Sequence, residues 1–429
     1  MRKSVSSALS ARRTAYLYVC ALLSVLWLFL PYGGYARMME GKYACYLLLT
    51  TGFLAAMAYC LLPDARGGRE LGVMDVEAGA YLAFSTLSAI CSPYGAQTLL
   101  GGTRRDGLLT LALYAATFWM LSRHLRADRR LLYLTALSAA LCDVLTLLQL
   151  AGYNPFWLYP VGLGYADGDG AYAGYFAGTS GNIDFTAFLL ALAVCVLTAA
   201  AIRLRMWTFA PVVVLTLWTL YRLGVSSAWV GIVCAVTWGL GLLVPQRRRE
   251  MLCVSAALSV AALLCLRFYA GDNQTLAEAS GLLRGDWNGA FGSGRVAVWR
   301  DCWQLVRQRP LLGGGPDTLW LRGIEPFAWV RGGAAIPADI TAAHNEYLNI
   351  LVNQGAAALL AYLALLAGAL IACFRRAERA EYAICGMGLL CYAAMACFSI
   401  STCITAPYVW VLLALCNRYD RKKNKVEKS

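Results

Sequence analysis

Long apolar runs alternate with short polar segments along most of the chain. A helix needs about 20 mainly apolar residues to cross the hydrocarbon core of a bilayer. Runs of suitable length cover residues 14–31, 43–62, 73–91, 107–122, 131–151, 182–202, 207–222, 224–244, 251–269, 350–373, 381–400 and 402–417. The pattern predicts an all-α, polytopic integral membrane protein with about 12 transmembrane helices, in which residues 1–429 form a single membrane domain.

One long hydrophilic segment, residues 270–343, separates the ninth run from the tenth. A loop of this size in a compact protein is usually functional. Within it, residues 294–307 have helical periodicity, and one stripe holds Val296, Trp299, Trp303 and Val306. The stripe predicts an amphipathic helix that lies on the outer leaflet of the membrane.

Composition and charge agree with this topology. Hydrophobic residues make up 60% of the chain and charged residues 14%, too apolar for a soluble protein of this length. Most Lys and Arg residues fall in the segments expected on the same side as the N-terminus, as cytoplasmic segments require. We therefore expect a multi-pass protein of the cytoplasmic membrane with both termini in the cytoplasm. The net charge of +13 then reflects topology, and no nucleic-acid partner is expected.

Two outer loops carry polar or aromatic residues whose role the sequence leaves open. Residues 152–181 combine many aromatic side chains with glycines, Asp167 and Asp169, and no Lys or Arg. Such a loop suits stacking on sugar rings and equally suits an interfacial aromatic belt. The acidic pair offers too few ligands for a calcium loop. The second loop contains Thr103, Arg104, Arg105 and Asp106 between glycines, which we interpret as a solvated turn.

The strongest candidate for acid–base chemistry is His344, one of only two histidines in the chain. It lies where the 270–343 segment meets the tenth apolar run, and Asn345 and Glu346 follow it. A histidine at such a boundary is a possible general base, although a helix cap or interfacial anchor is the simpler interpretation of the residue alone. Nearly all of the sixteen cysteines lie inside apolar runs, so we expect no metal site and no cofactor.

Arginines near this segment suggest an anionic substrate. Arg295 begins the amphipathic helix and Arg300 follows within it, and guanidinium forks match phosphate oxygens. Anchoring of the helix to lipid phosphates is the alternative. Polar residues at the start of the sixth run, including Asn182 and Asp184, lie at the same membrane surface; a helix N-cap explains part of this pattern.

The order of these motifs resembles the O-antigen ligase and Wzy-type polymerase superfamily. The resemblance covers roughly residues 90–410 and rests on the following elements: Gly178-x-x-Gly181-Asn182-x-Asp184, Ser227-Ala228-Trp229-Val230-Gly231, Gly294-Arg295 with Trp299, Pro310-Leu311-x-Gly313-x-Gly315, His344-Asn345-x-Tyr347-Leu348, and Gly355. It implies a GT-C-like membrane glycosyltransferase that inverts the anomeric carbon without a metal. The donor would be an undecaprenyl-diphosphate-linked glycan on the outer face of the cytoplasmic membrane. The acceptor would be a glycan, a lipid or a protein.

By the same resemblance, His344 would be the catalytic residue and Arg295 the diphosphate contact. The chain departs from the family at Ser226, where many members have an arginine. Arg222, one helical turn earlier, is the candidate substitute. Asp184 stands where the family often has asparagine.

The sequence does not separate a ligase from a polymerase or a protein-directed oligosaccharyltransferase. A glycolipid flippase or another 12-span transporter is the alternative from a different class. Transporters usually contain internal repeats that relate their halves, and no such repeat is visible here.

Overall fold

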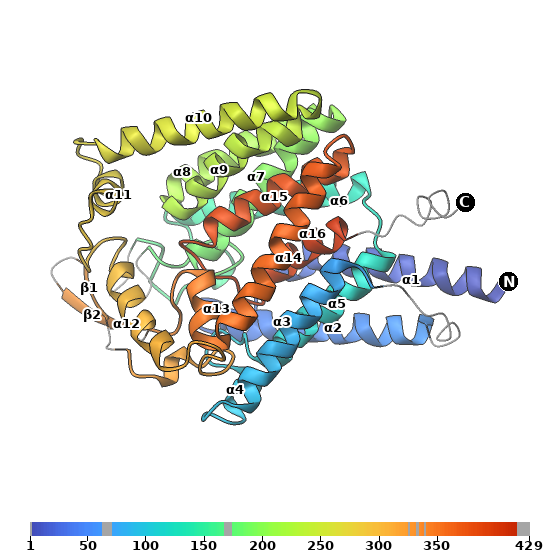
Figure 1. The fold of residues 1–429 in the computed structure, drawn as a ribbon, viewed down its shortest axis with the longest axis horizontal. Helices are drawn as coiled ribbons and strands as arrows, with labels where there is room; N and C mark the ends of the chain where they lie inside the picture. The colour runs from blue at the N-terminus through green and yellow to red at the C-terminus, as the bar shows by residue number, and fades with distance from the viewer. Residues whose placement is uncertain are drawn as a thin grey trace.

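The computed structural model describes residues 2–61, 71–166, 174–324, 327–331, 334–338 and 340–417. It is a bundle of long helices with one irregular region at one end of the bundle (Figure 1). The helices that overlap the expected apolar runs are α1 (Arg2–Ala21) with its continuation η1 (Leu22–Leu26), α2 (Met38–Leu61), α3 (Val73–Ile90), α5 (Leu108–His124), α6 (Arg129–Leu150), α7 (Ile183–Leu204), α8 (Ala210–Leu223), α9 (Ser226–Leu243), α10 (Arg248–Arg267), α14 (Ala356–Arg375), α15 (Ala380–Met395) and α16 (Ala406–Cys416).

Short helical turns join some of these elements. They are η2 (Gly34–Arg37), α4 (Gln97–Leu100), η4 (Pro155–Trp157), η5 (Trp207–Phe209), η6 (Pro245–Arg247) and η7 (Leu319–Leu321). Asp167 and Asp169, like the basic residues Arg66, Arg69 and Arg418, lie outside the described residues.

Within the described part of the chain, six helices are long and apolar enough to cross a membrane: Gly34–Leu61, Arg129–Leu150, Ile183–Leu204, Ser226–Leu243, Pro245–Arg267 and Ala356–Arg375. Three shorter apolar helices also lie in the bundle: Trp207–Leu223, Ala380–Met395 and Ala406–Cys416. The protein is therefore a mainly helical, multi-pass membrane protein. The count of twelve crossings stays a prediction.

Helix α7 is the most deeply buried of the six, because 83% of the residues in its apolar stretch are buried inside the protein. It packs against α8, α9 and α15, and α9 packs closely along α15. A Cβ atom at Gly231 would lie 2.9 Å from the carbonyl oxygen of Cys391, so a side chain there would force the two helices apart. Small residues in this part of α9 therefore permit close packing of the two helices.

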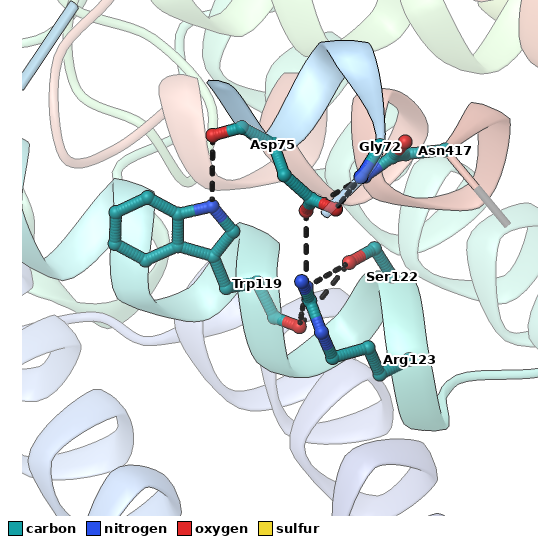
Figure 2. A network of polar contacts seen from close by, with 6 residues as sticks. All are labelled: Gly72, Asp75, Trp119, Ser122, Arg123 and Asn417. Atoms are coloured by element: carbon teal, nitrogen blue, oxygen red, sulfur yellow. Dashed lines mark hydrogen bonds and ion pairs between the residues drawn. The ribbon is translucent and has the colours of Figure 1, made fainter. Parts of the chain in front are cut away.

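A polar network fastens the opposite end of the bundle, where α3 begins (Figure 2). The Asp75 carboxylate accepts from the guanidinium of Arg123 at 3.0 Å, from the Gly72 amide at 2.9 Å and from the side-chain amide of Asn417 at 3.0 Å. These partners come from α5, the start of α3 and the end of α16. The charge in the third apolar run is thus paired with an arginine across the bundle.

The tenth apolar run, expected as one helix over residues 350–373, is broken. A separate short helix, α13 (Glu346–Gln354), ends at Gly355, and α14 begins directly after it. Gly355 has φ +87°, and a Cβ there would lie 2.2 Å from the carbonyl oxygen of Leu311. The break therefore follows from a close backbone crossing that only glycine permits.

The segment between α10 and α13 folds at the end of the bundle away from the start of α1 (Figure 1). It contains α11 (Gln274–Arg284), α12 (Arg295–Gln308) and an antiparallel hairpin of β1 (Phe327–Arg331) and β2 (Ala334–Ala338), which the apolar pattern did not predict. Helix α12 covers the residues of the predicted amphipathic helix, and its place on the outer leaflet stays a prediction. Val298, Cys302 and Val306 pack against protein, whereas Trp303 is 49% exposed.

Candidate active site

His344 occupies the turn that leads into α13. Its backbone has φ +49°, which is uncommon for a residue other than glycine. Asn345 then caps α13, because its Oδ1 accepts from the amide of Leu348 at 3.0 Å. The indole Nε1 of Trp299 donates to the carbonyl of Ala343 at 2.9 Å, so α12 holds the chain just before the histidine. The half-buried imidazole makes no hydrogen bond to any described residue, which leaves its nitrogens available to a substrate.

Two arginines place positive charge around this imidazole. Burial and then the guanidinium groups of Arg104 and Arg295 lower the pKa of His344 to about 3. Arg295 is the first residue of α12, and its Nη2 lies 3.9 Å from Oδ2 of Asp184 on α7. A histidine with this pKa is neutral at physiological pH and can accept a proton.

Arg104 is the part of the site that the sequence interpretation missed. Its Nε donates to Oγ1 of Thr341 at 3.1 Å, and its guanidinium lies 5.7 Å from the ring centre of Phe185. The residue is half-buried. The segment around Arg104 is therefore not a solvated turn. Through Arg104 it contacts Thr341, in the segment before His344, and Phe185, at the start of α7. No single-sequence signal connects positions 237 residues apart.

Asp317 holds the loop that carries Arg104. Its Oδ2 accepts from the amides of Gly102 at 2.8 Å and Asp106 at 3.2 Å. Gly101 has φ +73°, and a Cβ there would lie 2.3 Å from the same carboxylate oxygen. Burial raises the pKa of Asp317 to about 6, although both amides and the nearby arginines oppose the rise. A buried carboxylate thus fixes this loop to the 270–343 segment.

The glycine-rich turn after α12, residues 312–317, packs against the last turn of α13. The amide of Gly315 donates to the carbonyl of Asn353 at 2.7 Å, and that of Gly314 donates to Val352 at 3.2 Å. Arg322 donates to the same Val352 carbonyl at 2.7 Å. The last carbonyls of a helix lack partners within it, and these groups satisfy them. The glycines therefore allow close backbone packing against α13.

Asn182 and Asp184 lie at the N-terminus of α7. Oδ1 of Asn182 accepts from the amide of Asp184 at 2.7 Å, so Asn182 is the helix cap. The Gly178 carbonyl before it accepts from the hydroxyl of Tyr35 at 2.9 Å, and the Gly178 amide donates to Gln149 at 2.7 Å. This fixed turn presents the carboxylate of Asp184 to Arg295.

The remaining candidates contact groups other than the imidazole and the two arginines. Glu346 is buried, and its carboxylate accepts from the amide of Ser401 at 2.8 Å and from the Ser401 hydroxyl at 2.6 Å, which ties α13 to the segment before α16. Arg222 is exposed and lies 5.9 Å from the ring centre of Trp218. Arg300 is exposed and donates to the carbonyl of Trp287 at 3.0 Å.

The arrangement can bind an anion and accept a proton in one place. Four segments distant in sequence contribute: the 101–107 loop, the start of α7, the start of α12 and the turn before α13. The structure brings together His344, Arg295 and Asp184 from the sequence candidates, and it adds Arg104.

Comparison with known proteins agrees with the motif order. A family model described as "Wzy_C: O-Antigen ligase" matches residues 211–363. The match runs from α8 into α14 and includes Arg295 and His344, whereas Arg104 and Asp184 lie outside it. A search of curated proteins finds no match to the chain. The matched segment supports assignment of the chain to the O-antigen ligase and Wzy-type polymerase superfamily.

Proposed function

We propose that the protein transfers a glycan from an undecaprenyl-diphosphate carrier to an acceptor hydroxyl at the outer face of the cytoplasmic membrane. The observation that carries this proposal is a neutral imidazole, without a hydrogen-bond partner among the described residues, beside the guanidinium groups of Arg104 and Arg295. The family match supports a membrane enzyme of polysaccharide biosynthesis. The donor, the acceptor and the stereochemistry are part of the proposal.

His344 is the general base in this scheme. It accepts the proton of the acceptor hydroxyl while that oxygen attacks the anomeric carbon of the donor sugar. The bond between the anomeric carbon and the diphosphate oxygen breaks, and the diphosphate leaves with the electron pair. A single displacement of this kind inverts the anomeric carbon.

The two arginines bind the diphosphate and also tune the base. In the empty site, burial and then the charges of the two arginines lower the pKa of His344. A bound diphosphate cancels part of that charge, so the pKa of His344 rises when the donor is in place. The imidazole therefore becomes a stronger base only in the complex in which a proton must be removed.

Arg104 supplies the second guanidinium that Ser226 cannot. Its contacts with Thr341 and Phe185 hold it beside the imidazole, whereas Arg222 lies against Trp218. Asp184 orients Arg295 by an ion pair. Two guanidinium groups supply the positive charge that the leaving group needs, so we expect transfer to continue in the presence of EDTA.

Mass analysis of undecaprenyl-linked glycans in cells tests the proposal. Cells that carry His344→Ala accumulate single repeat units if the protein is a polymerase, or long unligated chains if it is a ligase. Unchanged lipid-linked and surface glycans in the variant would contradict the proposal and favour the transporter alternative.

A further inference from the structure

A cleft rich in tryptophan opens between α12 and the start of α13. It has a volume of about 440 Å³ and is lined by Trp287, Trp299, Trp303, Arg300 and Asn345, with Val296 and Leu348. Pockets for small ligands typically have volumes of roughly 300–1,000 Å³ and combine aromatic walls with a few polar groups. The cleft has both the size and the composition of a binding site.

The cleft lies beside the chain segments that carry His344 and Arg295. Asn345, which lines it, directly follows the histidine, and Val296 directly follows Arg295. The Trp299 indole donates to the carbonyl of Ala343, the residue before the histidine. A molecule in the cleft therefore touches the same chain segments that position the base and one of the arginines.

The polar side chains of the cleft, Asn345 and Arg300, have N–H groups that donate to no described residue. Oδ1 of Asn345 is committed to the cap of α13, while its amide nitrogen donates to no described residue. Arg300 uses Nη2 for the carbonyl of Trp287, and its other N–H groups make no hydrogen bond to a described residue. Trp299 has its indole N–H committed, so it offers ring surface to the cleft.

This combination selects the kind of molecule that fits. A sugar ring has C–H faces that pack on indole rings and a rim of hydroxyl oxygens that accept hydrogen bonds. An acyl chain would fill the apolar walls but would accept no hydrogen bond from the Arg300 and Asn345 donors. The donor set thus favours a sugar ring over a lipid tail.

We infer that this cleft binds a sugar ring of the transferred or accepting glycan, with Trp287 and Trp303 against its faces and Asn345 and Arg300 at its hydroxyls. The inference rests on the proposed function, because it assigns a glycan subsite beside the transfer site. The ring can belong to the donor or to the acceptor, and the test separates these sources.

Titration calorimetry on the full-length protein in detergent tests the assignment. The probes are two soluble glycans from the producing cells, one released by mild acid from the undecaprenyl-linked pool and one released from the cell surface. Trp287→Ala and Trp303→Ala are suitable variants because these side chains are 61% and 49% exposed, so their loss leaves the packed core intact. Trp207→Ala is the matched control, since Trp207 is 63% exposed and lies before α8, outside the cleft.

We expect the wild type to bind at least one probe and each cleft variant to bind it about tenfold more weakly. We expect the Trp207 control to bind like the wild type. The probe that binds identifies the donor or the acceptor as the source. No binding of either probe by the wild type at millimolar glycan, or equal affinity in the wild type and both cleft variants, overturns the inference.

The experiments distinguish failure of the proposed function from failure of the cleft assignment. The released glycans carry no diphosphate, so their binding needs no transfer reaction. If the protein transfers glycan but all variants bind the probes with equal affinity, the cleft assignment is contradicted and the proposed function is not. Protein that binds the probes through the cleft but transfers no glycan contradicts the proposed function.

Discussion

At the scale of single residues, the site depends on a histidine that its neighbours keep neutral. Burial and the charges of Arg104 and Arg295 lower the pKa of His344 to about 3, whereas an isolated histidine has a pKa of about 6.5. Asp184 partly offsets the charge of Arg295 through their ion pair at 3.9 Å. The basicity of the imidazole is therefore set by its burial and by the charges around it.

Removal of one arginine should raise the pKa of His344. The positive charge of Arg104 disfavours the imidazolium, so Arg104→Gln makes protonation easier and moves it to higher pH. Nitrogen-15 NMR of histidine can measure this, because the chain contains only two histidines and His124→Gln assigns the signals. We expect the wild-type imidazole to stay deprotonated down to about pH 4. Inorganic pyrophosphate should raise the pKa in the wild type; an unchanged pKa in Arg104→Gln would contradict the arrangement.

Arg104 should matter for transfer far more than the arginine next to it. Loss of a charge-assisted hydrogen bond costs roughly 1.5–3 kcal/mol, so Arg104→Gln should lower kcat/KM about ten- to a hundredfold. Arg105→Gln is the matched control, because it removes the same charge from the same loop. Steady-state transfer kinetics with both variants measure the difference. Equal losses would mean that only the net charge of the loop matters.

At the scale of elements, α13 positions the site, and three groups position α13. Asn345 caps its first turn, Arg322 donates to a carbonyl of its last turn, and the buried Glu346 ties it to Ser401. The glycine turn after α12 crosses it at Gly355. An isolated helix of nine residues is only marginally stable in water, so these tertiary contacts stabilise α13.

The crossing at Gly355 predicts a large effect of a small substitution. Gly355→Ala places a Cβ 2.2 Å from the Leu311 carbonyl at a backbone φ of +87°. Gly285→Ala is the control, because Gly285 has φ +91° with open space around it. Both variants carry the conformational cost, of roughly 1–3 kcal/mol, but only the first carries the clash. Thermal unfolding in detergent should show a clearly larger loss for Gly355→Ala, with loss of transfer; equal losses would contradict the crossing.

The order of apolar runs was enough to predict the helices of the bundle, since each run overlaps a helix. The break at Gly355 escaped prediction because a lone glycine in an apolar run does not reveal a crossing backbone. The helical periodicity of α12 did not reveal that the helix packs on protein through Val298 and Cys302 and presents Trp303 to a cleft. The candidates His344 and Arg295 came from local motifs. Arg104 escaped because its contacts with Thr341 and Phe185 exist only in the folded chain.

At the scale of the whole molecule, the site lies at one end of the helix bundle and the start of α1 lies toward the other (Figure 1). The first and last described helices lie close to neighbours at that second end: Ser10 on α1 contacts Cys60 on α2, and Asn417 after α16 bonds Asp75 on α3. The excess of basic residues in the segments expected on this side suggests that it faces the cytoplasm. The base and the arginines would then face outward.

Reporter fusions test this orientation. A fluorescent protein that matures only in the cytoplasm should be active when fused at either terminus, and a phosphatase that needs the outer compartment should be active when inserted into the 270–343 segment. The reverse pattern would place His344 at the cytoplasmic face and contradict the proposed site of transfer.

The most direct test of the account is glycan transfer by purified protein with and without the base. General-base catalysis contributes about a hundred- to ten-thousandfold, so His344→Ala should lower transfer by that factor while donor binding persists. His124→Gln, at the end of α5, is the matched control and should transfer like the wild type. Normal transfer by folded His344→Ala protein would contradict the central claim.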